Sequence, residues 1–144
     1  MQSELIEGIT VRPLRNGETE AVQAVFDRLG PRSRTERFGG AKTVLTVSDL
    51  EQLARVDRNH HVLVALVDCE PIGIARLVRD GRSAEVAVEV ADEWQSRRVG
   101  TLLMTRLAED ARAAGIEQLH AFVDYDNIKS RALMRRHSVQ VSAA

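Results

Sequence analysis

The sequence predicts a mixed α+β fold in which one mostly antiparallel sheet is flanked by helices. In the middle of the chain, three runs rich in apolar and β-branched residues follow one another with short turns between them, which is typical of an antiparallel meander. Before and after this region, apolar residues recur at the 3.6-residue period of helices. Because helices do not separate the three central strands, the pattern disfavours a doubly wound parallel sheet.

The part of the chain before the meander predicts one strand and three helices. These elements are a strand over residues 9–14 and helices over residues 17–29, 32–38 and 48–57. The first helix has one apolar face, and the Gly30-Pro31 pair is expected to end it. Ser48 and Glu51 have the spacing of a capping box, so we expect Ser48 to cap the third helix.

The meander and the elements after it complete the predicted order. The meander strands cover residues 61–67, 72–79 and 83–90, and they precede a helix over 100–114, a strand over 117–123, a helix over 127–136 and a strand stub over 139–141. Asp80 and Gly81 have the composition of a tight turn between the last two meander strands. Leu103 and Leu107 share one helical face, and Gly115 is the residue expected just past the end of that helix.

Composition indicates a globular domain. The 144 residues suit a single domain over residues 1–144. Hydrophobic residues make up 44 % and charged residues 28 %, close to the globular average, so a disordered chain is disfavoured. Twenty basic residues are balanced by twenty-one acidic ones, and the resulting net charge of −1 argues against a nucleic-acid partner.

Location is predicted from short local signals. The longest apolar run, residues 62–67, is far shorter than the ~20 residues that a membrane-spanning helix needs, so no membrane partner is expected. The N-terminal residues lack the basic start and apolar stretch of a secretory signal. The single cysteine, Cys69, cannot form an intrachain disulfide and suits a reducing compartment. We therefore expect a cytoplasmic protein.

A strand that leads directly into a helix is a candidate anion site. The strand ending at Val90 is followed by a polar loop with Arg97 and Arg98, and a helix begins near Gly100. The first amides of a helix lack partners inside the helix, and the helix dipole adds positive charge at that end. This arrangement favours a phosphate or pyrophosphate. The alternative is a loop whose arginines are simply solvated.

The same stretch resembles the cofactor loop of the GNAT N-acetyltransferases, which use acetyl-CoA. The run from Gln95 to Thr101 is similar to the family's Q/R-x-x-G-x-G/A pattern. The family's second signature, an Asn followed at steps of three by Ala or Ser and by Leu, is matched by Asn127, Ser130 and Leu133. The order of elements matches over nearly the whole chain. The segments that most resemble the bacterial protein-lysine acetyltransferase branch are residues 33–38, 73–76 and 84–87.

The resemblance implies a cleft for acetyl-CoA between the strands over residues 83–90 and 117–123. The loop residues that would hold its pyrophosphate are Arg97, Arg98, Val99, Gly100 and Thr101. The pantetheine arm would pair with the strand backbone at Val88 and Val90. Asn127 would reach the pantetheine or a water in the loop, with Ser130 nearby.

The resemblance also implies that Glu85 is the general base. An acceptor amine with a pKa near 10 is almost fully protonated at neutral pH and must lose a proton before it attacks a thioester. A carboxylate on a rigid strand, with its pKa raised by partial burial, can take that proton directly or through a water. Glu89 lies on the same strand face at about 13 Å, too far to share a proton, so Glu89 is expected to be a bystander.

Several positions depart from the family pattern. Arg98 replaces the first glycine of the loop, and Met134 stands where the family often has a tyrosine as general acid. Tyr125 is a substitute candidate, although a thiol pKa near 8.5 makes CoA a tolerable leaving group without an acid. Ser138-Val139 replaces the family's Gly-Phe pair, and the chain stops before the family's final β-hairpin. Either that hairpin is missing or a partner chain completes the sheet edge, which would make a homodimer.

Other chemistry is less consistent with the sequence. The four histidines lack the spacing of metal ligands, so no metal is expected. Cys69 lies in a predicted turn without a basic neighbour, which argues against an acetyl-cysteine mechanism. Four arginines cluster near the acceptor entrance that the family implies: Arg28, Arg32, Arg34 and Arg37. They either recognise an acidic protein surface or form a solvated face.

The predicted function is transfer of an acetyl or short acyl group from acyl-CoA to a primary amine by direct attack in a ternary complex. The expected acceptor is a protein lysine. A small amine is the second candidate, which an anionic acceptor pocket would favour, whereas an open and shallow groove would favour a protein. An acyl-CoA-binding module without catalysis is the alternative from another class, favoured by Arg98 and Met134.

Overall fold

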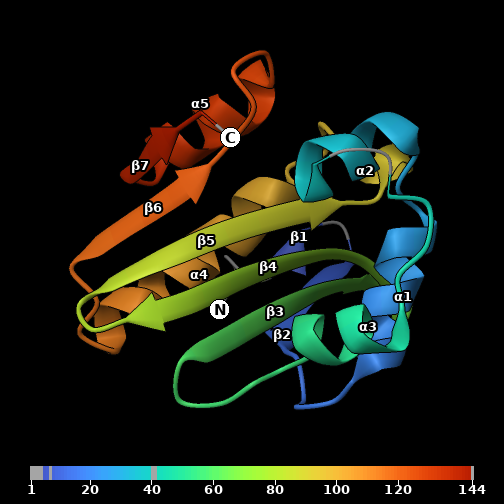
Figure 1. The fold of residues 1–144 in the computed structure, drawn as a ribbon, viewed down its shortest axis with the longest axis horizontal. Coiled ribbons are helices and arrows are strands. Elements are labelled where there is room, and N and C mark those ends of the chain that lie inside the picture. Colours follow the sequence, from blue (N-terminus) through green and yellow to red (C-terminus); the bar gives the residue numbers. More distant parts are fainter. Residues whose placement is uncertain (1–4, 7, 40–41, 144) are drawn as a thin grey trace.

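A computed structural model describes residues 5–6, 8–39 and 42–143 (Figure 1). Its seven-stranded sheet has the order β1-β2-β3-β4-β5-β6-β7, antiparallel from β1 to β5 and parallel from β5 to β7. The strands are β1 (Leu5–Ile6), β2 (Ile9–Pro13), β3 (His60–Val67), β4 (Glu70–Asp80), β5 (Ser83–Val90), β6 (Gln118–Phe122) and β7 (Val139–Ser142). The predicted mixed α+β fold is confirmed, and β1 is the strand that the sequence pattern missed.

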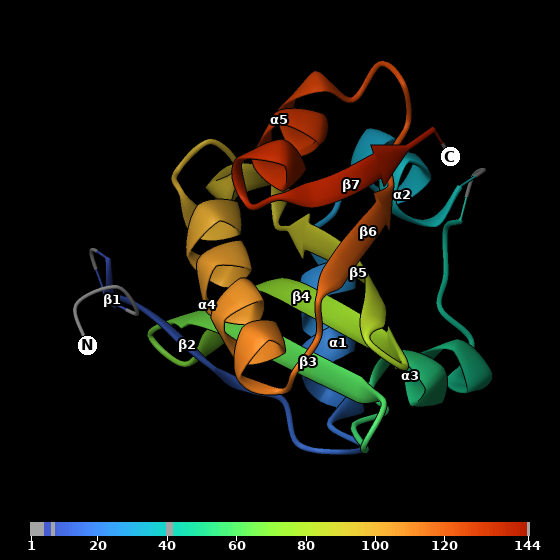
Figure 2. The same cartoon turned by 90° about the vertical axis from the view of Figure 1, so that its left-hand side faces the viewer.

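The helices cover both faces of the sheet. They are α1 (Thr19–Asp27), α2 (Pro31–Phe38), α3 (Val47–Leu53), α4 (Val99–Ala113) and α5 (Ile128–Arg136), with a 3-10 turn, η2, at Asp92–Trp94. On β3, Val62 and Val64 pack in the cluster that contains α1, whereas Leu63 and Ala65 pack in the cluster that contains α4. Figures 1 and 2 accordingly show α1 and α4 on opposite faces, and all four β3 side chains are buried because both faces are covered.

The third helix covers Val47–Leu53, so it begins one residue before the predicted range of 48–57 and ends four residues before the end of that range. Thr46 accepts a hydrogen bond from the Asp49 amide at 3.0 Å, and Asp49 accepts one from the Thr46 amide at 2.9 Å. The capping box is therefore Thr46 and Asp49, and the predicted pair of Ser48 and Glu51 is wrong. Lys42 lies 2.9 Å from the Asp49 carboxylate, which strengthens the observed cap.

The corner between α1 and α2 is pinned to η2. Pro31 is the first residue of α2, where a missing amide proton costs nothing, so Gly30-Pro31 begins α2. The expectation that this pair ends α1 is wrong, because α1 already ends at Asp27 and Arg28 caps it. The Gly30 amide donates to the Asp92 carboxylate at 3.0 Å, and a Cβ on Gly30 would lie 2.5 Å from that carboxylate. A side chain at this corner would displace the Asp92 carboxylate and break its hydrogen bond, and the contact places α2 beside the end of β5.

The sheet opens between β5 and β6. Their parallel pairing is confined to Ser83 with Gln118, Ala84 with Leu119 and Glu85 with His120. Beyond Glu85 the two strands separate, as the diverging arrows in Figure 1 show. The predicted splay between these two strands is confirmed.

The last described strand, β7, pairs in parallel with β6. Leu119 lies opposite Val139 and Phe122 lies opposite Ser142, and α5 forms the crossover between the two strands. A right-handed helical crossover is the usual link between parallel neighbours. The partner chain suggested for the sheet edge stays a prediction.

Candidate active site

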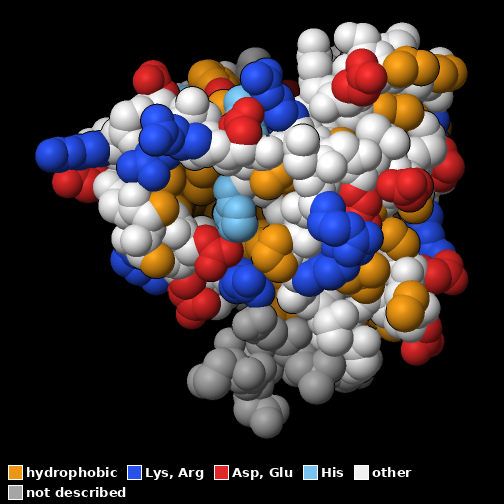
Figure 3. Space-filling view, turned by 90° about the horizontal axis from the view of Figure 1, so that it is seen from below, with side chains coloured by type: hydrophobic (Ala, Val, Ile, Leu, Met, Phe, Trp, Pro, Cys, Tyr) orange, Lys and Arg blue, Asp and Glu red, His pale blue; other side chains and the backbone are white. Residues whose placement is uncertain are grey.

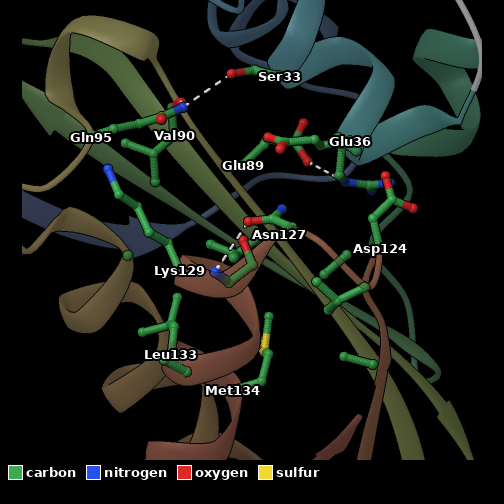
Figure 4. Close-up of a pocket in the computed structure, with 18 of the residues that line it drawn as sticks. Ser33, Glu36, Glu89, Val90, Gln95, Asp124, Asn127, Lys129, Leu133 and Met134 are labelled. Atoms are coloured by element: carbon green, nitrogen blue, oxygen red, sulfur yellow. Dashed lines mark hydrogen bonds and ion pairs between the residues drawn. The ribbon is translucent and has the colours of Figure 1, made fainter. Parts of the chain in front are cut away.

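A cleft of about 1160 Å³ occupies the gap between β5 and β6 (Figure 4). Its walls come from α2, from β5 and the loop that follows it, from the first turn of α4 and from the β6–α5 connection. The predicted base and cofactor-binding residues all line this cleft except Arg97 and Val99. Segments as far apart in the chain as Leu29 and Arg136 therefore meet at the opening of the sheet.

The β5 backbone beyond Glu85 is directed into the cleft. The Ala91 amide donates to the Ile72 carbonyl of β4 at 2.8 Å. Because backbone groups alternate in direction along a strand, the amides and carbonyls of Val88 and Val90 point away from β4. The Val90 carbonyl accepts a hydrogen bond from the Gln95 side chain at 3.0 Å, which agrees with this direction. The backbone groups of Val88 and Val90 are therefore directed to the cleft, and their pairing with the pantetheine arm stays a prediction.

The loop before α4 presents the start of the helix to the cleft. The first helical bond is donated by the Leu102 amide to the Arg98 carbonyl at 3.0 Å, so the amides of Val99, Gly100 and Thr101 have no acceptor inside the helix. A Cβ on Gly100 would lie 3.1 Å from the Leu133 side chain, so glycine permits the close approach of α5. The free amides and the helix dipole make this end suitable for an anion.

The two arginines of the loop differ in position. Arg98 caps α4 with φ 72°, the left-handed conformation that glycine adopts without strain, and its side chain lines the cleft. The Arg97 guanidinium lies over the Trp94 ring at 5.1 Å and is not among the groups lining the cleft. The structure therefore separates Arg97 from the other predicted cofactor residues.

Lys129 is a cleft residue that the sequence analysis missed. Its Nζ donates to the Ser96 hydroxyl at 3.0 Å, which ties α5 to the loop before α4. Figure 4 shows the Lys129 side chain in the cleft, on the side where Gln95 lies. Together with Arg98 it adds positive charge beside the free amides of α4. The sequence feature that could have identified Lys129 is its position two residues after Asn127, within the second family signature.

Asn127 has a structural role in addition to the predicted binding role. Its side-chain oxygen accepts from the Ser130 amide at 3.3 Å and caps α5. The capping bond uses the oxygen, so the Asn127 amide group is left to donate towards the cleft that it lines. Ser130 lines the cleft one turn further along α5.

The two carboxylates of β5 have opposite environments. Glu85 is exposed, lies opposite His120 at the last paired position and makes no side-chain hydrogen bond or ion pair among the described residues. Glu89 has a side chain only 2 % exposed and accepts from Arg37 at 2.7 Å. The partial burial assumed for Glu85 is therefore wrong, because α2 covers Glu89 and leaves Glu85 open.

Arg76 of β4 completes the buried charge cluster. Its Nη1 lies 3.9 Å from the Glu89 carboxylate. Burial lowers the pKa of Arg76 to about 10, and the attraction of Glu89 opposes that shift. Glu89 is thus held between two guanidinium groups, one on the sheet and one on α2.

The position of the family's general acid is apolar here. Met134 is 2 % exposed and lines the cleft, so it supplies packing and no proton. Tyr125 is 79 % exposed, stacks under the Arg131 guanidinium at 5.1 Å and does not line the cleft. The substitute role considered for Tyr125 has no geometric support.

The four arginines of the predicted cluster lie just after α1 and on α2, and they form hydrogen bonds within the chain. Arg28 pairs with Glu70 and Glu93, Arg32 with Glu36 and Arg37 with Glu89, while Arg34 donates to the carbonyls of Phe26 and Thr43. Each guanidinium therefore has a partner within the chain, although the Arg32 side chain is 84 % exposed. Recognition of an acidic protein surface by this cluster stays a prediction. On the face shown in Figure 3, basic and acidic side chains are likewise interspersed.

Outside the cleft, the described residues offer no second centre of the kinds considered from the sequence. No group of three His, Cys, Asp or Glu side chains among the described residues is arranged to hold a metal ion. Within the described ranges, no helix is both long and apolar enough to cross a bilayer. Cys69 is exposed in the turn between β3 and β4, outside the cleft.

The sheet is thus open between two parallel strands, and free helix amides and an unpaired strand carboxylate line the opening. The model of the acetyltransferase (GNAT) family matches residues 25–138. The chain belongs to the GNAT acetyltransferase family, whose members use acetyl-CoA as co-substrate.

Two curated acetyltransferases are similar in sequence. Acetyltransferase PA5475 of Pseudomonas aeruginosa is 30 % identical over 132 residues, which cover 87 % of this chain and 69 % of that protein. Acetyltransferase Pat of Mycolicibacterium smegmatis is 36 % identical over 136 residues, which cover 90 % of this chain and 40 % of that protein. The chain thus spans two fifths of the length of Pat.

Among solved structures, the GNAT domain of S. lividans PAT superposes with a TM-score of 0.83 at 26 % identity. The match covers 90 % of this chain and 80 % of that one. The cAMP-binding acyltransferase from Mycobacterium smegmatis matches with a TM-score of 0.62 at 30 % identity, covering 89 % of this chain and 38 % of that one. The resemblance to the protein acetyltransferase branch predicted from the sequence is confirmed at the level of the domain.

Proposed function

We propose that the protein transfers an acetyl group from acetyl-CoA to the amine of a protein lysine by direct attack in a ternary complex. The observation that carries the proposal is that the free amides of α4 and the unpaired carboxylate of Glu85 line one cleft. The likeness to Pat supports a protein acceptor. We also propose that residues 1–144 act as one domain, in the cytoplasm, with a homodimer as the candidate assembly.

The residues of the cleft fit acetyl-CoA. When bound, acetyl-CoA supplies an activated thioester carbonyl. The α4 amides, Arg98 and Lys129 would hold its diphosphate, since donors and positive charge converge there. The outward backbone groups of Val88 and Val90 would pair with the amides of the pantetheine arm, as a strand would.

Glu85 is the group that would prepare the amine. A lysine ammonium must lose a proton before it can attack, and a carboxylate within reach of the cleft accepts it directly or through a water. No cation among the described residues competes for the Glu85 carboxylate. Glu89 is less suited to this task because Arg37 already occupies one of its oxygens.

The proposal is tested by Glu85→Gln. We expect kcat/KM to fall by about 100-fold, the usual scale of losing a general base, while calorimetry shows an unchanged Kd for acetyl-CoA. Glu51→Gln on α3, outside the cleft, is the matched control for removing one negative charge. Turnover of Glu85→Gln near that of the parent would refute the base assignment.

A second candidate is a module that binds acyl-CoA without catalysis. The strained Arg98 cap and the buried Met134 favour it. Acetyl-CoA binding with no release of CoA over a panel of lysine peptides and small amines would establish this candidate. CoA release with any amine of the panel would reject it.

A further inference from the structure

His120 of β6 is an ionisable neighbour of the candidate base. It is paired with Glu85 in the parallel ladder between β5 and β6, at the last paired position before the sheet opens. Paired residues of neighbouring strands lie about 5 Å apart, and their side chains project from the same face of the sheet. The imidazole of His120 therefore lies beside the carboxylate of Glu85, at the closed end of the cleft.

The burial of the flanking residues agrees with this placement. Ala84 of β5 and Ala121 of β6 are buried in the core cluster that contains α4 and the α5 residues Leu133 and Met134. Successive side chains of a strand alternate between the two faces. Glu85 and His120 therefore both project from the face of the sheet that α4 and α5 leave uncovered.

The ring of His120 is held by two contacts. Its Nε2 lies 3.0 Å from the Ser142 hydroxyl of β7, and the ring packs edge-on against Phe122 with centroids 4.5 Å apart. Among the described residues, Nδ1 makes no hydrogen bond. With Nε2–H as the donor to Ser142, Nδ1 carries the lone pair that accepts a proton. One nitrogen is thus anchored, and the other is left for proton exchange.

Uncharged residues fill the remaining positions next to the pair. Val78 of β4 lies opposite Glu85, and Gln140 of β7 lies opposite His120. Helix α2 covers Glu89, four residues further along β5. The charged groups that face the pair from the other packed elements are one position further away, and they are Asp80 and Arg76 on β4 and His60 on β3 with its partner Asp57. Histidine is the residue type that changes charge between about pH 5 and pH 8, so His120 can alter the charge directly beside Glu85.

The candidate base needs a route for its proton. Glu85 would take one proton from the acceptor in each turnover and has to release it before the next. Glu85 lines the cleft, so it is covered while both substrates are bound. Ser142 is exposed on β7, the last described strand of the sheet. The path from Glu85 through His120 to Ser142 therefore leads from the closed end of the cleft to the edge of the sheet.

We propose that His120 is a positioning residue that acts through Glu85, by accepting its proton and passing a proton on to solvent. An N–H bond of the acceptor ammonium breaks, the electron pair stays on the nitrogen that attacks the thioester, and an O–H bond forms on Glu85. That proton then passes through one bridging water to Nδ1 of His120, and the imidazolium releases a proton to solvent. This inference rests on the proposed function and adds a residue to the same site.

The test is His120→Gln, assayed for CoA release with a lysine peptide. The amide group of glutamine can still donate to Ser142 but cannot take up a proton. We expect kcat to fall by about tenfold, less than for the loss of the base itself, while calorimetry shows an unchanged Kd for acetyl-CoA. His60→Gln is the matched control, because it makes the same change two strands away from Glu85.

Two readouts separate a proton relay from a structural role. The kcat of the parent should rise between about pH 5 and pH 8, as the imidazole becomes neutral and able to accept a proton, and His120→Gln should lose this rise. Imidazole added at constant pH and ionic strength should restore the kcat of His120→Gln, since it replaces the missing proton acceptor. A fall in kcat without these two effects would overturn the proposal.

The Glu85→Gln variant separates this inference from the proposed function. If Glu85→Gln is slow and His120→Gln turns over like the parent, the proposed function stands and the role of His120 is rejected. If the parent turns over no amine, the proposed function fails, and NMR still measures the coupling of the two residues. The midpoint of the His120 ring titration should move to lower pH by about half a unit in Glu85→Gln, because the neighbouring negative charge is lost. An unchanged midpoint would overturn the inference.

Discussion

The ion pair between Arg37 and Glu89 is expected to hold α2 against the wall of the cleft. Arg37→Met removes the guanidinium but keeps an unbranched side chain next to Phe38. Glu89, with a side chain 2 % exposed, would then retain Arg76 at 3.9 Å as its cation. The prediction is a large loss of stability for a single substitution on an exposed helix.

The magnitude follows from the two distances. At an effective dielectric constant near 20, the attraction between unit charges is about 6 kcal/mol at 2.7 Å and about 4 kcal/mol at 3.9 Å, and desolvation cancels part of each. Removing one partner of a buried pair costs about 3–5 kcal/mol. Because Arg76 still attracts Glu89, we expect about 3 kcal/mol, or a Tm lower by about 10 °C for a chain of this size.

Urea unfolding followed by circular dichroism measures this loss. Arg32→Met on the same helix is the control, since the Arg32 side chain is 84 % exposed and its pair with Glu36 should be worth less than about 0.5 kcal/mol. Added salt should leave the Arg37→Met effect unchanged, because a buried pair is little screened. A loss for Arg37→Met no larger than that for Arg32→Met would refute the reasoning.

Two further predictions concern charge at other sites. Lys129→Met should raise the Kd for acetyl-CoA about fivefold, as measured by calorimetry, because it removes a charge beside the phosphate-binding amides. Lys129→Arg keeps the charge and should stay within about twofold of the parent. Equal affinities for all three proteins would contradict a role of Lys129 in phosphate binding. The Arg12 guanidinium lowers the pKa of Glu18 from 4.5 to about 2. This pair therefore stabilises the fold fully above pH 4.5, and its contribution is lost as the pH falls towards 2. Glu18→Gln should be less stable than the parent at pH 7, and the difference in unfolding free energy should vanish near pH 2; a constant difference would contradict the assignment.

The regular elements could be predicted because their signals are local. The period of Leu103 and Leu107 sets the buried face of α4, and Gly115, with φ 83°, follows its end as expected. The loop signature from Gln95 to Thr101 likewise lies within one stretch of chain. Interactions between near neighbours decide such features, so a sequence pattern is sufficient for them.

The start of a helix could not be predicted where two neighbouring pairs of residues could each form its N-terminal cap. Thr46 with Asp49 and Ser48 with Glu51 have the same spacing, and either pair satisfies a capping box. The contact of Lys42 with Asp49 favours the first pair, and it depends on how the preceding segment lies against the helix.

The sequence by itself determined the order of the elements along the chain after β1, the helix N-terminus at the cofactor loop and the alternation that puts Glu85 and Glu89 on one strand face. Only the tertiary structure decided which of these two carboxylates is buried, because α2 lies over Glu89 and not over Glu85. It also brought Lys129 to Ser96 across 33 residues. The burial of a side chain and its choice of ion-pair partner depend on which elements pack against each other. Local sequence patterns do not specify that packing directly.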